Sequence, residues 1–189
     1  ITSAEDVETH PGLPVIGVLR KVAGSTSQLA LSVFDKPRTG YAEGIRSIHA
    51  AMRLSLPDHN WKRVMVTSSV PQEGKTSVAT ALGVSMGKGQ KVLVVEADLR
   101  LPSFAKALKI PPKPGISELL SGQATLDQCL RKHESGVSFL PAGTPPPNVA
   151  EFLSSAAFRQ MLDQLSEQYD HVILDCPPCL AGSDSMVLS

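Results

Sequence analysis

Length, composition and charge narrow the class of this protein before any motif is considered. The chain has 189 residues, and its 18 Lys and Arg balance its 18 Asp and Glu, so its formal net charge at pH 7 is zero. That length suffices for one α/β domain with a buried core. The balanced charge excludes a strong field that would draw the chain to nucleic acid or to an anionic membrane. We therefore expect no nucleic-acid partner.

Two further absences bear on the compartment. No apolar run reaches the roughly 18 residues of a membrane span, and no signal-peptide pattern opens the sequence. Cys129, Cys176 and Cys179 are too few and too unevenly spaced for a disulfide framework. Both observations lead us to expect a soluble chain in a reducing, cytosolic compartment.

The first part of the chain is expected to be an arm followed by a helix. Residues 1–37 are mixed in composition and low in periodicity, so we interpret them as an arm or linker, and residues 38–189 as the folded domain. Apolar residues then recur at helical spacing over residues 41–54, opposite Glu43 and Arg46, until Pro57 stops the pattern.

A phosphate-binding loop is the strongest signal in the sequence. An apolar strand at residues 64–67 leads into a loop with the ending Gly-Lys-Thr, and a helix-like run follows at residues 78–88. In such a loop, backbone N–H groups and the positive end of the following helix hold the phosphates of a nucleotide. Lys75 would reach the β- and γ-phosphates, and Thr76 would bind Mg²⁺. The residues expected to surround the nucleotide are Ser69, Pro71, Gln72, Glu73, Gly74, Lys75, Thr76 and Ser77.

One position of this loop departs from the usual pattern, which begins with glycine, because the residue there is Ser69. A simpler alternative is a helix N-terminus that contains Gly-Lys-Thr by chance. The order of strand, loop and helix favours the nucleotide-binding interpretation.

Acidic residues end the next two predicted strands. The apolar run at residues 92–95 leads into Glu96 and Asp98, and the run at residues 171–174 leads into Asp175. Ligands of open parallel sheets bind at the carboxyl ends of the strands, so we expect these three carboxylates to converge on Mg²⁺ and the phosphates. The alternative is that each carboxylate only caps a following helix or turn.

The remaining pattern completes a fold prediction. A short helix is expected between Gly115 and Gly122, a buried strand at residues 137–140 and a helix at residues 156–168. Strands that alternate with helices predict a P-loop α/β fold with a mostly parallel sheet flanked by helices. Because such a domain normally adds further strands after Asp175, we expect its C-terminal strands to be missing.

Several segments together resemble one family, the bacterial tyrosine kinases (BY-kinases) that form the cytoplasmic part of exopolysaccharide co-polymerases. SSVPQEGKTS resembles the Walker A motif of that family, EADLRLP its Walker A′ motif and VILDCPP its Walker B motif. GISELLSG and LPAGTPPPNVAEFLSS resemble further family segments in the right order, and Glu43 with Arg46 resembles the helix motif that mediates ring assembly. The resemblance covers nearly the whole chain.

This resemblance implies ATP-dependent phosphorylation of a C-terminal tyrosine cluster, in trans within a ring, that controls exopolysaccharide or capsule synthesis and export. It implies ATP and Mg²⁺ as cofactors and a homo-oligomer formed through the helix of Glu43 and Arg46. It also implies a membrane-embedded co-polymerase region, in the same or a partner chain, at the cytoplasmic side of the inner membrane. The expected catalytic residues are Lys75, Glu96, Asp98 and Arg100, and the expected metal ligands are Thr76, Asp98 and Asp175.

Two positions depart from the family pattern. Glu96 stands where the family usually has Asp, at the position expected to supply a base for the tyrosine hydroxyl, and its side chain is longer by one methylene. His49 stands where the assembly motif expects a second arginine. The two tyrosines, Tyr41 and Tyr169, lie outside a tail cluster, so the acceptor tyrosines are expected outside this sequence.

Three alternative functions stay open. Partitioning and division-site ATPases share the predicted fold, but their P-loop carries a signature lysine where this chain has Val70. Cys176 and Cys179 form a CxxC pair, which is consistent with metal or iron–sulfur carriage or with a structural turn. The third alternative is a nucleotide-binding module that assembles but has no kinase activity.

Overall fold

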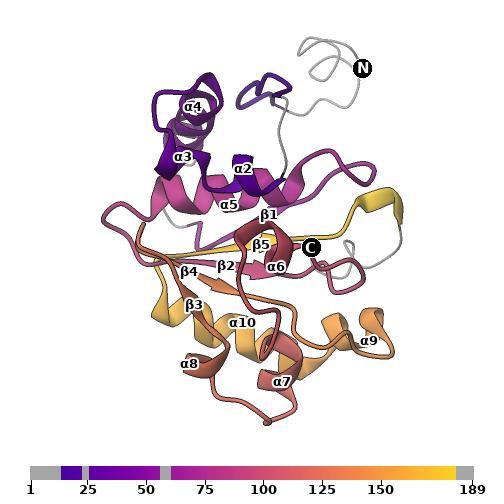
Figure 1. Ribbon diagram of the computed structural model, residues 1–189. Helices are drawn as coiled ribbons and strands as arrows, with labels where there is room; N and C mark the ends of the chain where they lie inside the picture. The colour runs from indigo at the N-terminus through magenta and orange to yellow at the C-terminus, as the bar shows by residue number, and fades with distance from the viewer. Residues whose placement is uncertain (1–13, 23–25, 56–60, 182–189) are drawn as a thin grey trace.

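A five-stranded sheet forms the centre of the fold, with helices on both of its faces (Figure 1). The computed structural model describes residues 14–22, 26–55 and 61–181. The strand order is β1-β5-β2-β4-β3. Neighbouring strands run parallel except β3, which is antiparallel to β4, so the predicted mostly parallel sheet is confirmed. The strands are β1 (Arg63–Val66), β2 (Val92–Glu96), β3 (Arg131–Lys132), β4 (Val137–Leu140) and β5 (His171–Asp175).

The helices divide between the two faces of the sheet (Figure 1). The upper face in that view carries α2 (Thr26–Ala30), α3 (Ser32–Asp35), α4 (Gly40–Ser55), α5 (Lys75–Met86) and α6 (Phe104–Leu108). The lower face carries α7 (Ile116–Leu120), α8 (Leu126–Cys129), α9 (Val149–Ser154) and α10 (Ala156–Gln168). A short 3-10 turn, η1 (Cys179–Ala181), follows β5.

The central strands are buried because helices cover both faces of the sheet. Every residue of β2 and β5 is buried, as expected for parallel strands covered on both sides. Successive side chains enter opposite cores: Val92 and Val94 pack with α5, whereas Leu93 and Val95 pack with α10. β1, at the edge, is only partly buried.

The predicted crossover helix is present but starts earlier than expected. α5 begins at Lys75, directly after Gly74, instead of at residue 78. A Cβ atom added at Gly83 would lie 2.5 Å from Cγ2 of Val94. The glycine therefore lets α5 approach β2 closely, and this contact brings the start of the helix to the end of the strands.

The predicted helix at residues 156–168 matches α10, and the helix predicted at residues 41–54 is α4, longer by one residue at each end. Part of the predicted arm also packs on the domain: α2 and α3 contact α5, and Ala30 and Val33 are buried. Residues 1–13 and 23–25 lie outside the described residues, and the boundary near residue 37 stays a prediction. None of the described helices combines the length and hydrophobicity needed to cross a membrane.

Candidate active site

The loop between β1 and α5 has the backbone shape of a phosphate-binding loop. Gln72 and Gly74 have positive φ angles of 68° and 92°, and this left-handed backbone turns the chain sharply into α5. Gly74 is the N-cap of α5, so the free N–H groups of the first helical turn follow it directly. The helix N-terminus therefore lies at the end of β1, in the position that binds anions in P-loop proteins.

Hydrogen bonds from both sides hold the loop. Oε2 of Glu73 accepts hydrogen bonds from the N–H groups of Ser69 (2.8 Å) and Val70 (3.2 Å). The segment after β5 donates from the other side, because the N–H of Cys179 lies 2.8 Å from the carbonyl oxygen of Ser68. The expected loop residues differ in exposure: Pro71 and Gln72 are exposed, whereas Thr76 and Ser77 are buried.

Lys75 and Asp98 meet at the sheet edge. The Nζ atom of Lys75 lies 2.8 Å from Oδ2 of Asp98, and the two side chains are 13% and 4% exposed. Oδ1 of Asp98 accepts a hydrogen bond of 3.2 Å from the N–H of Leu101. The lysine of the loop and the carboxylate that follows β2 thus come together as the sequence predicts, in a nearly buried ion pair.

Thr76 and Asp175 form a second contact at this edge. The hydroxyl of Thr76 lies 2.7 Å from Oδ2 of Asp175 and 3.1 Å from the hydroxyl of Ser103. Oδ1 of Asp175 is buried and has no hydrogen-bond partner within the described residues. Burial raises the pKa of Asp175 to about 7, and the nearby carboxylates of Glu96 and Asp98 add to that shift against the opposing effects of Thr76 and Lys75.

This second contact fits a hard cation. An unpartnered buried carboxylate oxygen next to a threonine hydroxyl offers the oxygen ligands that Mg²⁺ prefers, and water and phosphate oxygens would supply the others. Within the described ranges, no group of three or more His, Cys, Asp or Glu side chains is arranged to hold a metal ion by itself. The residues therefore suit an ion that arrives with a nucleotide.

Glu96 lies at the carboxyl end of β2, as the sequence predicts, but its carboxylate accepts hydrogen bonds from backbone N–H groups outside the phosphate-binding loop. It is 2% exposed, and its Oε1 accepts hydrogen bonds from the N–H groups of Ser103 and, at 2.6 Å, Phe104. Its Oε2 accepts a bond of 3.0 Å from the N–H of Ala142. Burial raises the pKa of Glu96 despite these bonds. Both oxygens are therefore occupied by backbone donors, which does not suit a base.

The remaining predicted residues lie elsewhere. Arg100 is exposed on the segment that follows Asp98. Glu43 and Arg46 are exposed on α4, and a guanidinium nitrogen of Arg46 donates a hydrogen bond of 2.8 Å to the carbonyl oxygen of Pro37. His49 turns inward, where its Nδ1 lies 3.4 Å from the hydroxyl of Ser85 on α5.

The CxxC pair braces the loop next to the site. Cys176 is buried, and its N–H bonds to the carbonyl oxygen of Val66, whereas Cys179 is exposed and its Sγ lies 3.4 Å from the hydroxyl of Thr67. The hydroxyl of Thr67 also donates to the carbonyl oxygen of Pro177 at 2.7 Å. These contacts agree with the structural turn that the sequence left open.

Sequence reasoning missed Ser103 and the loop after β4. The hydroxyl of Ser103 contacts that of Thr76. The only feature of the sequence that could have indicated this contact is the position of Ser103, just before α6 and seven residues after Glu96. The loop after β4 is fixed by Glu118, whose Oε1 accepts from the N–H of Thr144 (3.1 Å) and whose Oε2 accepts from the N–H of Gly115 (2.8 Å). Together with Ala142, this loop borders the carboxylates.

The fold and the loop define a P-loop nucleotide-binding protein of the α/β class. Comparisons with known proteins agree: the model of a family described as "AAA domain" matches residues 71–188. Tyrosine-protein kinase YwqD of Bacillus subtilis (strain 168) is 34% identical over 172 residues, which are 90% of this chain and 73% of that protein. Tyrosine-protein kinase ptk of Acinetobacter johnsonii is 36% identical over 149 residues, 78% of this chain and 20% of that protein.

A solved structure gives the same result. The kinase domain of the Escherichia coli tyrosine kinase ETK has a TM-score of 0.87 and 27% identity, and the match covers 100% of this chain and 78% of that one. The chain belongs to the family of bacterial tyrosine-protein kinases, which confirms the resemblance seen in the sequence. It spans most of YwqD but only about a fifth of ptk.

Proposed function

We propose that this chain is the ATP-binding and catalytic part of a protein-tyrosine kinase, which transfers the γ-phosphoryl group of ATP to tyrosine hydroxyls. The observation that carries the proposal is the convergence of two contacts, Lys75 with Asp98 and Thr76 with Asp175, at the end of a P-loop. Phosphoryl transfer depends mainly on positioning and charge neutralisation, and this edge provides a cation, two carboxylates and a helix N-terminus for both.

Lys75 neutralises the charge of the transferred group. Its ammonium would leave Asp98 for the β- and γ-phosphate oxygens, while the loop N–H groups and the start of α5 hold the rest of the triphosphate. Thr76, Asp98 and Asp175 would hold Mg²⁺, directly or through water, and the ion would shield the phosphate oxygens. We assign Arg100, exposed beside Asp98, to neutralising phosphate charge as well.

The proton of the tyrosine hydroxyl passes to Asp98 in this proposal. The tyrosine oxygen forms a bond to the γ-phosphorus, the bond to the β–γ bridging oxygen breaks, and ADP leaves. Asp98 gains a free oxygen once Lys75 turns to the phosphates, whereas Glu96 keeps three backbone donors on its two oxygens. The structure therefore favours Asp98 over Glu96 as the base, and Glu96 as the residue that fixes the loops around it.

A phosphotransfer assay tests the proposal. The full gene product is incubated with Mg²⁺, labelled ATP and a tyrosine-containing copolymer of glutamate and tyrosine, beside Lys75→Met and the control Lys88→Met, an exposed lysine beyond α5. We expect phosphotyrosine from the wild type and the control, and a loss of at least about a hundredfold in Lys75→Met. Little phosphate should appear on Tyr41, because its hydroxyl is buried.

Other outcomes would support the alternative functions. ATP hydrolysis without phosphotyrosine, abolished by Lys75→Met, would indicate a switch ATPase of the partitioning or division-site class. ATP binding without hydrolysis or transfer would indicate an assembly module that has no kinase activity.

We further propose that copies of the chain assemble through α4. Support comes from the exposure of Glu43 and Arg46 on one helix and from membership of the family. The acceptor tyrosines would then be a C-terminal cluster of a neighbouring copy. The proposed setting is a membrane-embedded polysaccharide co-polymerase, with this chain at the cytoplasmic side of the inner membrane. Phosphorylation would then regulate the synthesis and export of exopolysaccharide.

A further inference from the structure

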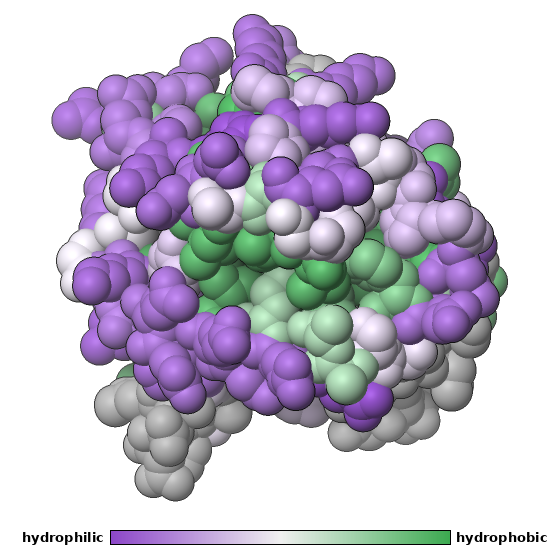
Figure 2. Space-filling model, turned by 90° about the horizontal axis from the view of Figure 1, so that it is seen from below, coloured by the Kyte–Doolittle hydropathy of each residue, from purple (hydrophilic) through white to green (hydrophobic). Residues whose placement is uncertain are grey.

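An apolar groove crosses the face of the molecule opposite α5. Figure 2 shows apolar residues gathered in a hollow at the centre of this face, within a border of hydrophilic residues. The groove has a volume of about 220 Å³ and lies between the helices α7, α8 and α10. We call it the α10 groove; its lining is mainly apolar (Leu119, Leu120, Leu126, Ala157, Met161 and Leu165), and three glutamines of α10 complete it.

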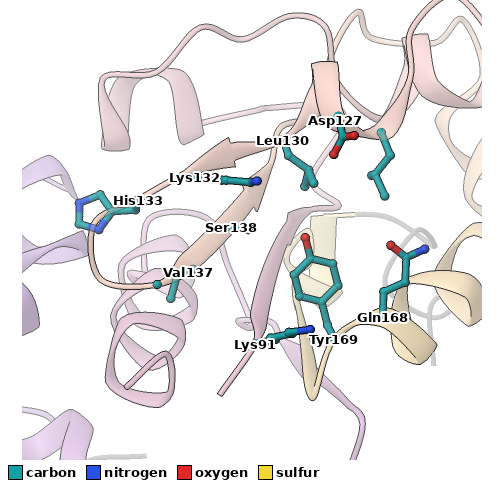
Figure 3. A pocket seen from close by; sticks show the side chains of 11 residues that line it. Lys91, Asp127, Leu130, Lys132, His133, Val137, Ser138, Gln168 and Tyr169 are labelled. Carbon is teal, nitrogen blue, oxygen red and sulfur yellow. The ribbon is translucent and has the colours of Figure 1, made fainter. Parts of the chain in front are cut away.

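A second hollow, of about 420 Å³, continues from the α10 groove, because Leu126 and Gln168 line both. It lies where β2 and β4 begin, at the sheet edge opposite the P-loop. Figure 3 shows Lys132 and the hydroxyl of Tyr169 pointing into this space, with Lys91 beside the tyrosine ring. We call it the lysine hollow.

Three side chains of the lysine hollow, Lys91, Lys132 and Ser138, have no polar partner among the residues that the structure describes. Lys132 and Ser138 are opposite each other in the β3–β4 ladder, so both side chains lie on the face of the sheet that carries α10. Neither Lys91 nor Lys132 forms an ion pair within the described part of the chain. Ser138 is 8% exposed, and its hydroxyl makes no hydrogen bond to any described residue. Two lysines and one carboxylate, that of Asp127, line the hollow, so its lining is net positive; the carboxylate of Asp170 lies next to it, with Oδ2 2.8 Å from the N–H of Lys91.

We propose that the α10 groove and the lysine hollow together bind a short peptide segment of a protein partner. Apolar side chains of the peptide enter the groove, and acidic residues next to them face Lys91 and Lys132. Charge complementarity then sets the direction of the peptide, and burial of its apolar side chains provides most of the affinity. The site is separate from the P-loop, so its occupation does not require ATP.

Other occupants match the surface less well. A small phosphorylated molecule would occupy the lysine hollow but leave the apolar groove exposed to water. A bilayer inserts apolar side chains that protrude, whereas Leu119, Leu126 and Met161 line a concavity. A nucleic acid follows a continuous track of cations, and here two lysines lie at one end of an apolar groove.

Selection from a display library of short random peptides tests the proposal. The full gene product is the bait, and peptides that bind the empty support are removed. We expect the enriched peptides to combine apolar residues with adjacent Asp or Glu. Fluorescence polarisation of one such peptide should then show at least about tenfold weaker binding to Leu126→Asp and to Lys132→Glu, with no change for the control Lys88→Glu.

A charge swap sharpens the test. Replacing the acidic residues of the enriched peptide by Lys should abolish binding to the wild type and restore it to Lys132→Glu. Leu126 is only half-buried and Lys132 is exposed, so both variants should keep the thermal melting curve of the wild type; if Leu126→Asp unfolds, the charge swap decides alone. Enrichment of basic peptides, no enrichment, or binding unchanged by both variants would overturn the proposal. The proposal would also be overturned if the wild type bound phosphatidylglycerol vesicles and Leu126→Asp did not, because the groove would then bind a membrane.

Discussion

The Nζ atom of Lys75 lies 2.8 Å from Oδ2 of Asp98, so the lysine proposed to hold phosphates is paired with a carboxylate proposed to hold the metal ion. ATP without Mg²⁺ must compete with Asp98 for this lysine. The variant Asp98→Asn should therefore bind metal-free ATP about three- to tenfold more tightly, because a competing negative charge is removed. Isothermal titration calorimetry in the presence of a chelator measures this affinity.

Catalysis should change in the opposite direction. Asp98→Asn is expected to lower phosphotransfer by about a hundredfold or more, since the proposed base is lost. Lys75→Met serves as the control that loses both binding and transfer. An Asp98→Asn variant with the metal-free ATP affinity of the wild type would show that the ion pair does not restrain Lys75.

The raised pKa of Asp175 should make the unfolding free energy depend on pH. Its pKa is raised from 3.8 to about 7 by burial, so between these values the folded chain binds a proton that the unfolded chain has lost. When a chelator removes metal ions, the protonated carboxyl of Asp175 therefore contributes its full stabilisation below about pH 4. This stabilisation is lost as the pH rises to about 7. Above pH 7, Asp175→Asn should exceed the wild type in unfolding free energy by roughly 1–4 kcal/mol.

Urea denaturation across this pH range measures the difference. The slope of unfolding free energy against pH should be shallower in Asp175→Asn than in the wild type, and addition of Mg²⁺ with ADP should stabilise the wild type more than the variant. Equal slopes in the two proteins would mean that Asp175 is ionised normally in the folded chain.

Glu96 separates a positioning role from a catalytic one. Glu96→Gln keeps the size of the side chain, but its NH₂ group cannot accept the bond from Ala142 or those from Ser103 and Phe104. We expect a loss of about 1–3 kcal/mol in stability and faster amide hydrogen exchange at the donors that then face the NH₂ group, either Ala142 or Ser103 and Phe104. Glu96→Asp, which is too short to reach both segments, should behave similarly.

The pH profile of kcat distinguishes the two roles. If Glu96 only positions the loops, Glu96→Gln lowers kcat but keeps the pH at which activity rises. If kcat of Glu96→Gln no longer rises with pH, and the backbone amides that bond to this side chain exchange as slowly as in the wild type, Glu96 would instead be the base.

The strands and long helices were predictable because apolar runs and helical spacing repeat over enough residues to be recognised. α2 and α3 have only five and four residues, too few to show a period, and so their packing on α5 was not foreseen. The acidic residues at the strand ends identified the sheet edge, but not their partners. Glu96 bonds to Ala142, which lies 46 residues further along the chain, and only the folded sheet brings them together.

Gly115 should be essential for the loop after β4. A Cβ atom there would lie 2.3 Å from the carbonyl oxygen of Pro141 and 2.4 Å from the amide nitrogen of Gly143, and backbone atoms cannot move aside cheaply. We expect Gly115→Ala to cost about 1–3 kcal/mol of stability, by urea denaturation, and to reduce phosphotransfer through the displaced loop. Gly40→Ala is the matched control, since a Cβ atom there meets nothing within 4 Å.

Arg46 tests the proposed assembly surface. It is exposed on α4, so Arg46→Ala removes a surface guanidinium with little effect on the core. If α4 forms the contact between copies, this change should weaken self-association by about tenfold or more, as measured by sedimentation velocity over a range of concentrations. Lys88→Ala, which removes an exposed cation outside α4, is the control.

His49 should respond differently from Arg46, although it occupies the position of the second arginine in the assembly motif. Its ring faces Ser85 on α5 and is half-buried, and partial burial, with help from Arg53 and His171, lowers its pKa and favours its neutral form. We expect His49→Gln to leave self-association unchanged. His49→Arg should destabilise the fold by about 1–3 kcal/mol, because it forces a charge between α4 and α5, and should not strengthen assembly. Tighter self-association of a stably folded His49→Arg variant would show that this side chain reaches the contact between copies.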